Sequence, residues 1–256
     1  MSKWARIDYQ GKPTIAEVKG DTLHLHDGDL FSDHQENGLT VAIAEANFLA
    51  PSDPKQFLGL WNNFHERRVL DKLFMPKSPL IFVKLASCIT GHKSEISLPK
   101  GYDQRVKFEA ELGVVIGKEC FQVSTEDVDD YIFGYTCVND VTAPETLFEE
   151  EGFTHWCRSK SFPTFGPLGP FIETDIDPSK LNIQAILDGK LEQNYPVSDM
   201  IFSPQEIVSI ISQDIKLLPG DVIACGTSSG AIDMQIGQTI EINIDGIGRL
   251  ENTYVG

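Results

Sequence analysis

The sequence predicts an α+β protein that is rich in β-structure. Short apolar stretches with strand-like alternation recur along most of the chain, and turn sequences that contain glycine separate them. Only two stretches have a helical pattern, so strands do not alternate with helices as they do in a parallel βαβ protein. With 256 residues, the chain is long enough for one large domain or for one domain plus a small one.

The N-terminal part is predicted to form a small β-rich domain. Turn sequences such as Asp27-Gly28 and Asn37-Gly38 separate four expected strands, at residues 4–9, 14–18, 22–26 and 39–43. Prolines then surround one expected helix at residues 56–73, in a segment that suits a linker or a mobile lid. We therefore place the small domain and this lid or linker segment in residues 1–74.

The remaining residues, 75–256, are predicted to form the larger domain. Its expected strands lie at residues 80–85, 107–117, 131–138, 182–187, 222–225 and 239–244. One amphipathic helix is expected at residues 203–216, where Ser203 is a suitable N-cap and Pro204 occupies the first helical position. Isoleucines at helical spacing form the buried stripe of this helix.

The composition narrows the possible partners. The net charge is −17, with 38 acidic residues against 21 basic ones, which disfavours nucleic acid or an anionic membrane as the main partner. We find no apolar run near the ~20 residues that span a bilayer, and the N-terminus lacks a signal peptide. The cysteines are odd in number, and none forms a Cys-x-x-Cys pair, so we expect free, mostly buried thiols in a cytoplasmic protein.

Two glutamates, Glu109 and Glu111, lie inside the apolar strand expected at residues 107–117. Side chains alternate along a strand, so both carboxylates point to the same face. Two like charges side by side repel each other and resist burial, and a hard divalent cation would remove both penalties. The alternative is a solvated outer face of an edge strand. Spacing alone leaves both interpretations open.

Asp140 is a candidate third carboxylate. It follows Asn139 directly after the strand expected at residues 131–138, where a side chain can lean over the sheet edge. If the two strands are neighbours, Asp140 would complete an oxygen site for a metal with open positions for substrate. Otherwise, Asn139-Asp140 would simply cap a turn.

Two familiar catalytic motifs are excluded. The segment Gly226-Thr-Ser-Ser-Gly230 matches a nucleophile elbow, but the last histidine, His155, precedes it, and a strand rather than a helix is expected after it. This loop could still bind a carboxylate through its N–H groups.

The histidines show no zinc-ligand spacing. His65 and His92 are candidate general bases, each with a surface position as the alternative.

Lys160 is a further candidate, because it precedes a rigid segment rich in proline and glycine, where its ammonium could neutralise a substrate carboxylate or enolate. An exposed lysine is the alternative.

Taken together, these motifs resemble the fumarylacetoacetate hydrolase family over about residues 75–255. The resemblance is carried by four segments in order: Glu109-Ala-Glu111-Leu-Gly-Val-Val-Ile-Gly, Gly134-Tyr with Asn139-Asp140-Val-Thr-Ala, Lys160-Ser-Phe with Gly166-Pro-Leu-Gly-Pro170, and Leu218-Pro-Gly-Asp through Gly226-Thr227-Ser-Ser-Gly230. It implies the mixed β-sandwich roll of the family's C-terminal catalytic domain, usually as a homodimer. The resemblance also implies that Mg²⁺ or Mn²⁺ is bound by Glu109, Glu111 and Asp140. It implies that the substrate is bound by Lys160, Thr227 and Gly226.

The lid departs from the family pattern. Hydrolytic relatives carry Asn-Tyr-x-x-His-x-x-Glu, whose histidine and glutamate activate water. Here, placing His65 at the histidine position puts Arg68 at the glutamate position. The other alignment puts Arg67 and Leu70 at the two positions, so neither keeps the pair.

The resemblance therefore implies a metal-dependent enzyme for a small 2-oxo or 2-hydroxy-dienoate acid, with Lys160 and His65 as the candidate catalytic residues. The missing lid pair favours an activity like that of 2-hydroxyhepta-2,4-diene-1,7-dioate isomerase or 5-oxopent-3-ene-1,2,5-tricarboxylate decarboxylase. One alternative is a C–C bond hydrolase of acylpyruvate or fumarylpyruvate type. Another is a non-catalytic relative that binds a metabolite or a protein partner.

Overall fold

A mixed ten-stranded sheet runs through the chain, which this computed structural model describes from residue 2 to residue 256. In spatial order its strands are β4 (His34–Ala42), β3 (Thr22–Gly28), β2 (Lys12–Lys19), β1 (Lys3–Tyr9), β12 (Phe171–Glu173), β10 (Ile132–Asn139), β9 (Ala110–Ile116), β15 (Val222–Ala224), β5 (Phe57–Trp61) and β6 (Leu80–Lys84). Neighbouring strands are antiparallel except for β15 and β5, which run parallel. The predicted β-rich α+β class is confirmed.

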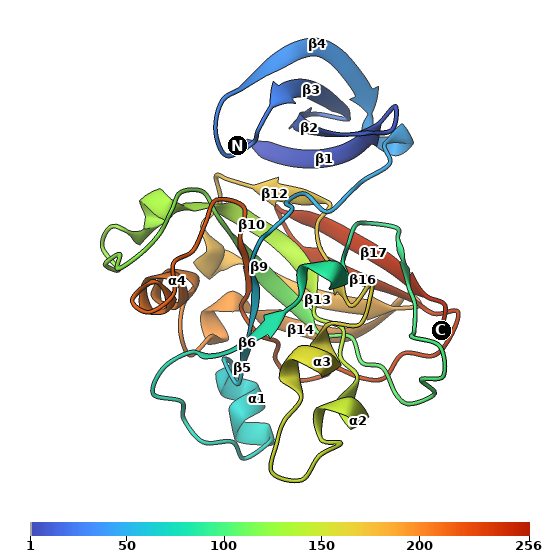
Figure 1. Ribbon diagram of the computed structural model, residues 1–256, viewed down its shortest axis with the longest axis vertical. Coiled ribbons are helices and arrows are strands. Elements are labelled where there is room, and N and C mark those ends of the chain that lie inside the picture. The colour runs from blue at the N-terminus through green and yellow to red at the C-terminus, as the bar shows by residue number, and fades with distance from the viewer. Residues whose placement is uncertain (1) are drawn as a thin grey trace.

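A second sheet packs against the central strands β9 and β10 and closes the sandwich (Figure 1). In spatial order its strands are β14 (Lys190–Pro196), β13 (Asn182–Leu187), β16 (Thr239–Ile244), β17 (Gly248–Tyr254) and β8 (Glu95–Ile96). Every second residue of β13 and β16 is buried, as the alternating pattern predicts for strands with one core face. A short parallel pair, β7 (Ile89–Thr90) and β11 (Gly166–Pro167), lies outside both sheets.

The N-terminal strands β1 to β4 form a meander at one end of the molecule (Figure 1). They enclose a small core of their own, made by Ala5, Ile7, Ala16, Leu23, Leu25 and Phe48. This meander is continuous with the larger sheet, because β1 pairs with β12. The four strands expected in this part of the chain are therefore present, and the domain boundary after residue 74 stays a prediction.

Strand β9 is buried on both faces. It lies inside the sheet between β10 and β15, and all seven of its residues are buried. Glu109, just before it, is 8% exposed and Glu111 is 1% exposed. The solvated edge strand that spacing alone left open is therefore wrong. Because these carboxylates are removed from water, their charge must be balanced within the protein.

The helices are few and short: α1 (His65–Leu70), α2 (Pro144–Leu147), α3 (Trp156–Lys160) and α4 (Pro204–Ser212), with 3₁₀ helices at Ile43–Glu45, Ala86–Cys88, Val128–Tyr131, Pro178–Lys180 and Val197–Asp199. Helix α4 begins as predicted, with Ser203 and Glu206 forming a capping box, and it ends one turn early.

The helix expected at residues 56–73 is wrong over its first part. Residues 57–61 form strand β5 instead, and only α1 is helical. The physical reason is tertiary, because Phe57, Leu58 and Leu60 are buried and their backbone pairs with both β15 and β6. Sheet pairing outweighs a weak local helical preference.

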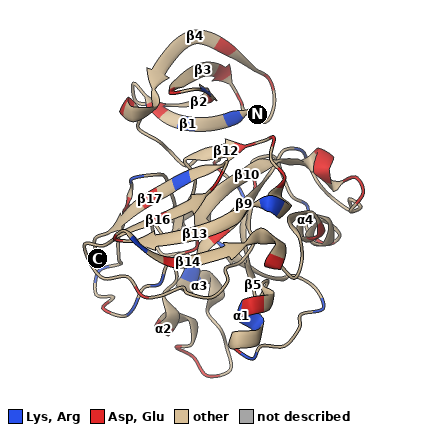
Figure 2. Ribbon diagram, turned by 180° about the vertical axis from the view of Figure 1, so that it is seen from behind, with Lys and Arg blue, Asp and Glu red and all other residues tan. Residues whose placement is uncertain are grey.

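Charged residues are spread over the molecule, and the cysteines follow the expectation from composition. Asp and Glu occur on the N-terminal strands, in loops and on helices, and both α1 and α3 carry Lys or Arg (Figure 2). All five cysteines are free thiols, and only Cys157 is exposed, so the prediction of mostly buried thiols is confirmed. Within residues 2–256, the structure contains no helix with the length and apolar character that a bilayer span requires.

Candidate active site

The register between β9 and β10 brings three carboxylates together. Glu111 is paired with Val138, and the backbone N–H of Asp140 donates to the carbonyl of Glu109 at 2.9 Å. Asp140 therefore lies directly opposite Glu109, one step beyond the last pair of the ladder. Because directly opposed residues point to the same face, Glu109, Glu111 and Asp140 converge on one side of the sheet.

The three carboxylates have the geometry of a divalent-metal site. Each offers an oxygen that lies within 4.8 Å of the other two, and all three side chains are buried. Burial, together with the neighbouring Asp140 and Glu109 carboxylates, raises the pKa of Glu111 well above its ordinary value. A hard divalent cation would relieve this repulsion, and carboxylate oxygens are ligands that suit Mg²⁺ and Mn²⁺. The residues present therefore fit such an ion.

Three basic side chains surround the carboxylates. The Lys160 ammonium donates to both Glu109 and Asp140, and the Lys84 ammonium donates to Asp140 Oδ1 at 2.7 Å. Arg67 Nη1 lies 3.5 Å from Glu109 Oε1. Burial lowers the pKa of Lys160, but Asp140 and Glu109 outweigh burial and keep this pKa above its ordinary value. The three carboxylates thus face three cations in a buried cluster.

The pKa of Glu109 shows how strong this balance is. Burial by itself raises the pKa of its carboxyl, but Lys160 and Arg67 outweigh burial and hold the pKa at about 2. The two glutamates therefore differ sharply, although they are two residues apart on one strand. Glu109 lies beside the cations, whereas Glu111 is mainly surrounded by other carboxylates and by the backbone of Gly226.

Gly226 and Thr227 approach the cluster from the loop after β15. The Gly226 N–H donates to Glu111 Oε2 at 2.7 Å, so this group positions Glu111. Gly226 has a φ of +91°, and a Cβ there would lie 3.2 Å from the Leu60 carbonyl oxygen, which explains the glycine. The Thr227 hydroxyl is held by Gln193 at 2.9 Å and Tyr195 at 3.2 Å.

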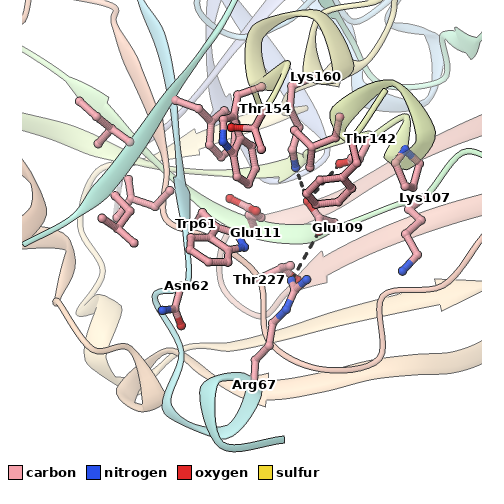
Figure 3. A pocket seen from close by; sticks show the side chains of 18 of the residues that line it. Trp61, Asn62, Arg67, Lys107, Glu109, Glu111, Thr142, Thr154, Lys160 and Thr227 are labelled. Carbon is pink, nitrogen blue, oxygen red and sulfur yellow. Dashed lines mark hydrogen bonds and ion pairs between the residues drawn. The ribbon is translucent and has the colours of Figure 1, made fainter. Parts of the chain in front are cut away.

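A cavity of about 550 Å³ opens above the carboxylates (Figure 3). Its polar end is lined by Glu109, Glu111, Thr142, Lys160 and Thr227. Its other end is mostly apolar and aromatic, and it is lined by residues of β5, β6, α3 and the segment after α1. The volume suits a small organic molecule, one end of which would contact the carboxylate and lysine cluster.

The structure brings six of the predicted site residues together and leaves both candidate histidines outside the cavity. Glu109, Glu111, Lys160 and Thr227 line the polar end of the cavity. Asp140 and Gly226 do not line it, but they contact Lys160 and Glu111 respectively. His65 is exposed at the start of α1 and does not line the cavity, so its role as a base stays a prediction. His92 lies elsewhere, where its Nδ1 accepts the N–H of Glu251.

Sequence reasoning missed several residues of the site. Arg67, rather than His65, extends from α1 into the cavity (Figure 3). Lys84, Thr142, Gln193 and Tyr195 all position the side chains named above. Of these residues, only Lys84 had a feature in the sequence that could have identified it, because it is a lone lysine at the end of an apolar strand. The other residues depend on contacts between distant segments.

The chain matches the family described as fumarylacetoacetate (FAA) hydrolase C-terminal over residues 56–255. Residues 2–51 match a second family, described as Rv2993c-like, N-terminal. An uncharacterized protein of Archaeoglobus fulgidus is 40% identical over 219 residues, which cover 86% of each chain.

Solved structures with the same fold extend this likeness to the whole chain. A 5-carboxymethyl-2-hydroxymuconate delta-isomerase from Mycobacterium smegmatis is 30% identical, with a TM-score of 0.90 and 99% of each chain covered. A 2-hydroxyhepta-2,4-diene-1,7-dioate isomerase from Mycobacterium marinum is 32% identical, also with a TM-score of 0.90, over 100% of this chain and 98% of that one. The fold that the sequence resemblance implied for the larger domain is confirmed, and so is the small N-terminal β-structure that the strand pattern predicted.

Proposed function

This chain belongs to the fumarylacetoacetate hydrolase family, and from this premise we propose that it is a divalent-metal-dependent enzyme acting on a small 2-oxo acid or its 2-hydroxy-dienoate form. The proposed chemistry is isomerisation or decarboxylation through an enolate. One observation carries the proposal, namely the buried cluster of Glu109, Glu111 and Asp140 with Lys160 at the polar end of the cavity.

The cluster has roles for each of its parts. Glu109, Glu111 and Asp140 would hold Mg²⁺ or Mn²⁺. The ion supplies a Lewis acid that stabilises negative charge developing on a substrate oxygen. Without an ion, three cations already face the three carboxylates, so a bound divalent ion leaves an excess of positive charge. This excess matches an anionic 2-oxo acid, although the protein as a whole is acidic.

Lys160 and Thr227 would position the substrate. The Lys160 ammonium lies between two carboxylates, which favour its charged form, so it acts as a hydrogen-bond donor to a substrate oxygen. The Thr227 hydroxyl lines the same cavity and is held by Gln193 and Tyr195, so its orientation is set before substrate binds. A fixed donor costs little reorganisation during the reaction.

We favour isomerisation or decarboxylation over hydrolysis because the described lining of the cavity lacks the histidine of the pair that activates water in hydrolytic relatives. Arg67 is the residue that α1 places in the cavity, and a guanidinium does not accept a proton. Among the lining residues of the described chain, there is no histidine. Two solved neighbours at 30% and 32% identity are named as isomerases of 2-hydroxy-dienoate acids, which supports the same choice.

A panel of 2-oxo acids, tested with Mg²⁺, Mn²⁺ or EDTA, tests the proposal. We expect metal-dependent loss of dienol absorbance or release of CO₂. Glu109→Ala should abolish both metal binding and turnover, whereas Glu150→Ala, at an exposed glutamate, should change neither. Metal-dependent cleavage of an acylpyruvate would replace the proposal with a C–C hydrolase. Metal binding without turnover of any compound would identify a binding protein.

The expected homodimer and the cytoplasmic location are part of the same proposal. Light scattering of the purified protein at several concentrations tests the dimer, and a monomer at all of them would contradict it.

A further inference from the structure

The apolar end of the cavity is formed by five aromatic side chains, which we call the aromatic wall: Trp61, Phe74, Phe82, Phe148 and Trp156. We propose that the aromatic wall binds an uncharged aryl group, so that the preferred substrates are 2-oxo acids whose tail ends in an aryl group rather than in a second carboxylate. Of the two proposed reactions, such substrates fit isomerisation, because decarboxylation through an enolate needs a carboxylate β to the keto group. This inference rests on the proposed function, because it assigns the other end of the same site.

Four of the five rings, those of Trp61, Phe74, Phe82 and Trp156, form a connected surface. Phe82 and Trp156 are stacked, with centroids 5.2 Å apart and an interplanar angle of 13°. Trp61 approaches Trp156 at 5.9 Å and Phe74 at 6.1 Å, both at tilted or edge-on angles. Because aromatic rings favour stacked and edge-to-face contacts with other rings, this arrangement offers both kinds of contact to a planar guest.

The aromatic wall begins directly beside the carboxylate cluster. The Lys160 ammonium lies 4.9 Å from the centroid of the Phe82 ring. Phe82 can lie flat against β5 because residue 59 is glycine, where a Cβ would come within 2.4 Å of the ring. One molecule with its 2-oxo acid group at Lys160 would therefore place its tail against the aromatic wall.

Four of the five rings remain accessible, as a binding surface requires, whereas Phe82 is buried. Phe148 is 70% exposed and Phe74 is 59% exposed, while Trp61 and Trp156 are half-buried. Binding is favourable when an apolar group displaces water from aromatic surface that lines a concave cavity. Because the rings and the carboxylates line one cavity, the occupant that fits both is a small molecule that carries both kinds of group.

The cations of the cavity do not provide a site for a second carboxylate at the aromatic wall. Lys160 and Arg67 are already directed to Glu109. The remaining lining cation, Lys107, lies on the opposite side of Glu109 and Glu111 from Trp61 in the view of Figure 3. A tail that reaches Trp61 therefore meets rings, whereas Lys107 is the lining cation for which the described residues show no ion pair.

Calorimetric titration of the Mg²⁺-loaded protein with three probes tests this inference. The probes are pyruvate, 2-oxo-4-phenylbutanoate and 2-oxoadipate, which share the 2-oxo acid group and differ in the tail. We expect the phenyl compound to bind at least ~10-fold more tightly than pyruvate, and 2-oxoadipate to bind no more tightly than pyruvate. Equal affinities for the phenyl compound and pyruvate would overturn the inference.

Substitutions in the aromatic wall test whether the phenyl group binds there. Trp156→Leu and, independently, Trp61→Leu should lower the ratio of phenyl-compound affinity to pyruvate affinity at least ~5-fold. Lys107→Met should leave this ratio unchanged. Tighter binding of 2-oxoadipate that disappears in Lys107→Met would instead assign the tail to a carboxylate and overturn the inference.

Failure of the inference is distinguishable from failure of the proposed function. If pyruvate binds only with Mg²⁺ and the phenyl tail adds nothing, the proposed function stands and the aromatic wall is not a substrate site. If the phenyl preference depends on Trp156 but no 2-oxo acid is turned over, the aromatic wall stands and the proposed catalysis does not.

Discussion

The two ends of the cavity are built in opposite ways. The carboxylate cluster of Glu109, Glu111 and Asp140 lies on or beside central strands, and each member is at most 8% exposed. The aromatic wall lies on the end of β5, the edge strand β6, the short helix α3 and loops, with rings that are up to 70% exposed. The part that would perform the chemistry is thus tied to the core of the sheet.

Because of this difference, substitutions at the two ends of the cavity are expected to change different properties of the protein. Every charge of the cluster has a partner within the fold, so a change there alters both stability and chemistry. The exposed rings of the aromatic wall contribute little to the core, so a change there is expected to alter the choice of substrate alone. Loops and edges on a rigid scaffold are where binding residues can vary most freely.

After the loss expected for Glu109→Ala, the largest effect on turnover is expected from Glu111→Gln. The amide keeps an acceptor for the Gly226 N–H but removes one charge from the cluster, so metal-dependent turnover should fall about 10³-fold. Without metal, the variant should melt at a higher temperature, because burial and like charges destabilise the Glu111 carboxylate. Thermal melts with Mg²⁺ and with EDTA measure both effects.

The exposed Glu150→Gln is the control for Glu111→Gln and should keep the stabilisation by Mg²⁺. A Glu111→Gln protein that is still stabilised by Mg²⁺ as strongly as the parent would remove Glu111 from the metal site.

Lys84→Met should strongly destabilise the fold. The fully buried Lys84 ammonium donates to Asp140 and to two backbone carbonyls, and its loss leaves the buried Asp140 carboxylate with one partner fewer. Breaking such a pair costs about 3–5 kcal/mol, which urea unfolding measures. Lys190→Met is the matched control, because Lys190 is 76% exposed beside Glu192 and should change stability by less than about 1 kcal/mol. Similar losses in both variants would contradict a special role for burial.

Tyr195→Phe should have an intermediate effect. The Tyr195 hydroxyl donates to the Ala110 carbonyl and lies 3.2 Å from the Thr227 hydroxyl. Its removal should cost about 1–2 kcal/mol of stability and should also raise KM, because Thr227 loses a partner that orients it. Tyr9→Phe is the control, since within residues 2–256 the Tyr9 hydroxyl makes no hydrogen bond. A Tyr195→Phe enzyme with unchanged KM would show that Gln193 alone orients Thr227.

Phe148→Ser should have the smallest effect on stability. The ring is 70% exposed, so the free energy of unfolding should change by no more than about 0.5 kcal/mol. The neighbouring Leu147 is only 6% exposed, and Leu147→Ser should cost at least about 2 kcal/mol in the same urea experiment. A large loss for Phe148→Ser would show that this part of the aromatic wall is covered in solution.

Local patterns predicted a good part of the fold and the site. Strand alternation placed Glu109 and Glu111 on one face, and the capping residue Ser203 located the start of α4. Local patterns failed where a distant strand decides the conformation, as at residues 57–61, which form β5 between β15 and β6. At the lid, local patterns did not show that Arg67 lines the cavity while His65 is exposed, and the role of His65 as a base stays a prediction.

The sequence by itself determined which chemical groups are present and which of them share a strand face. Alternation is a property of the backbone, so it made the pairing of Glu109 with Glu111 predictable. Only the tertiary structure decided that Asp140 lies opposite Glu109, that β9 is buried on both faces, and that five rings line the same cavity. These outcomes depend on strand register and packing between residues far apart in the chain, for which local sequence carries no direct energetic signal.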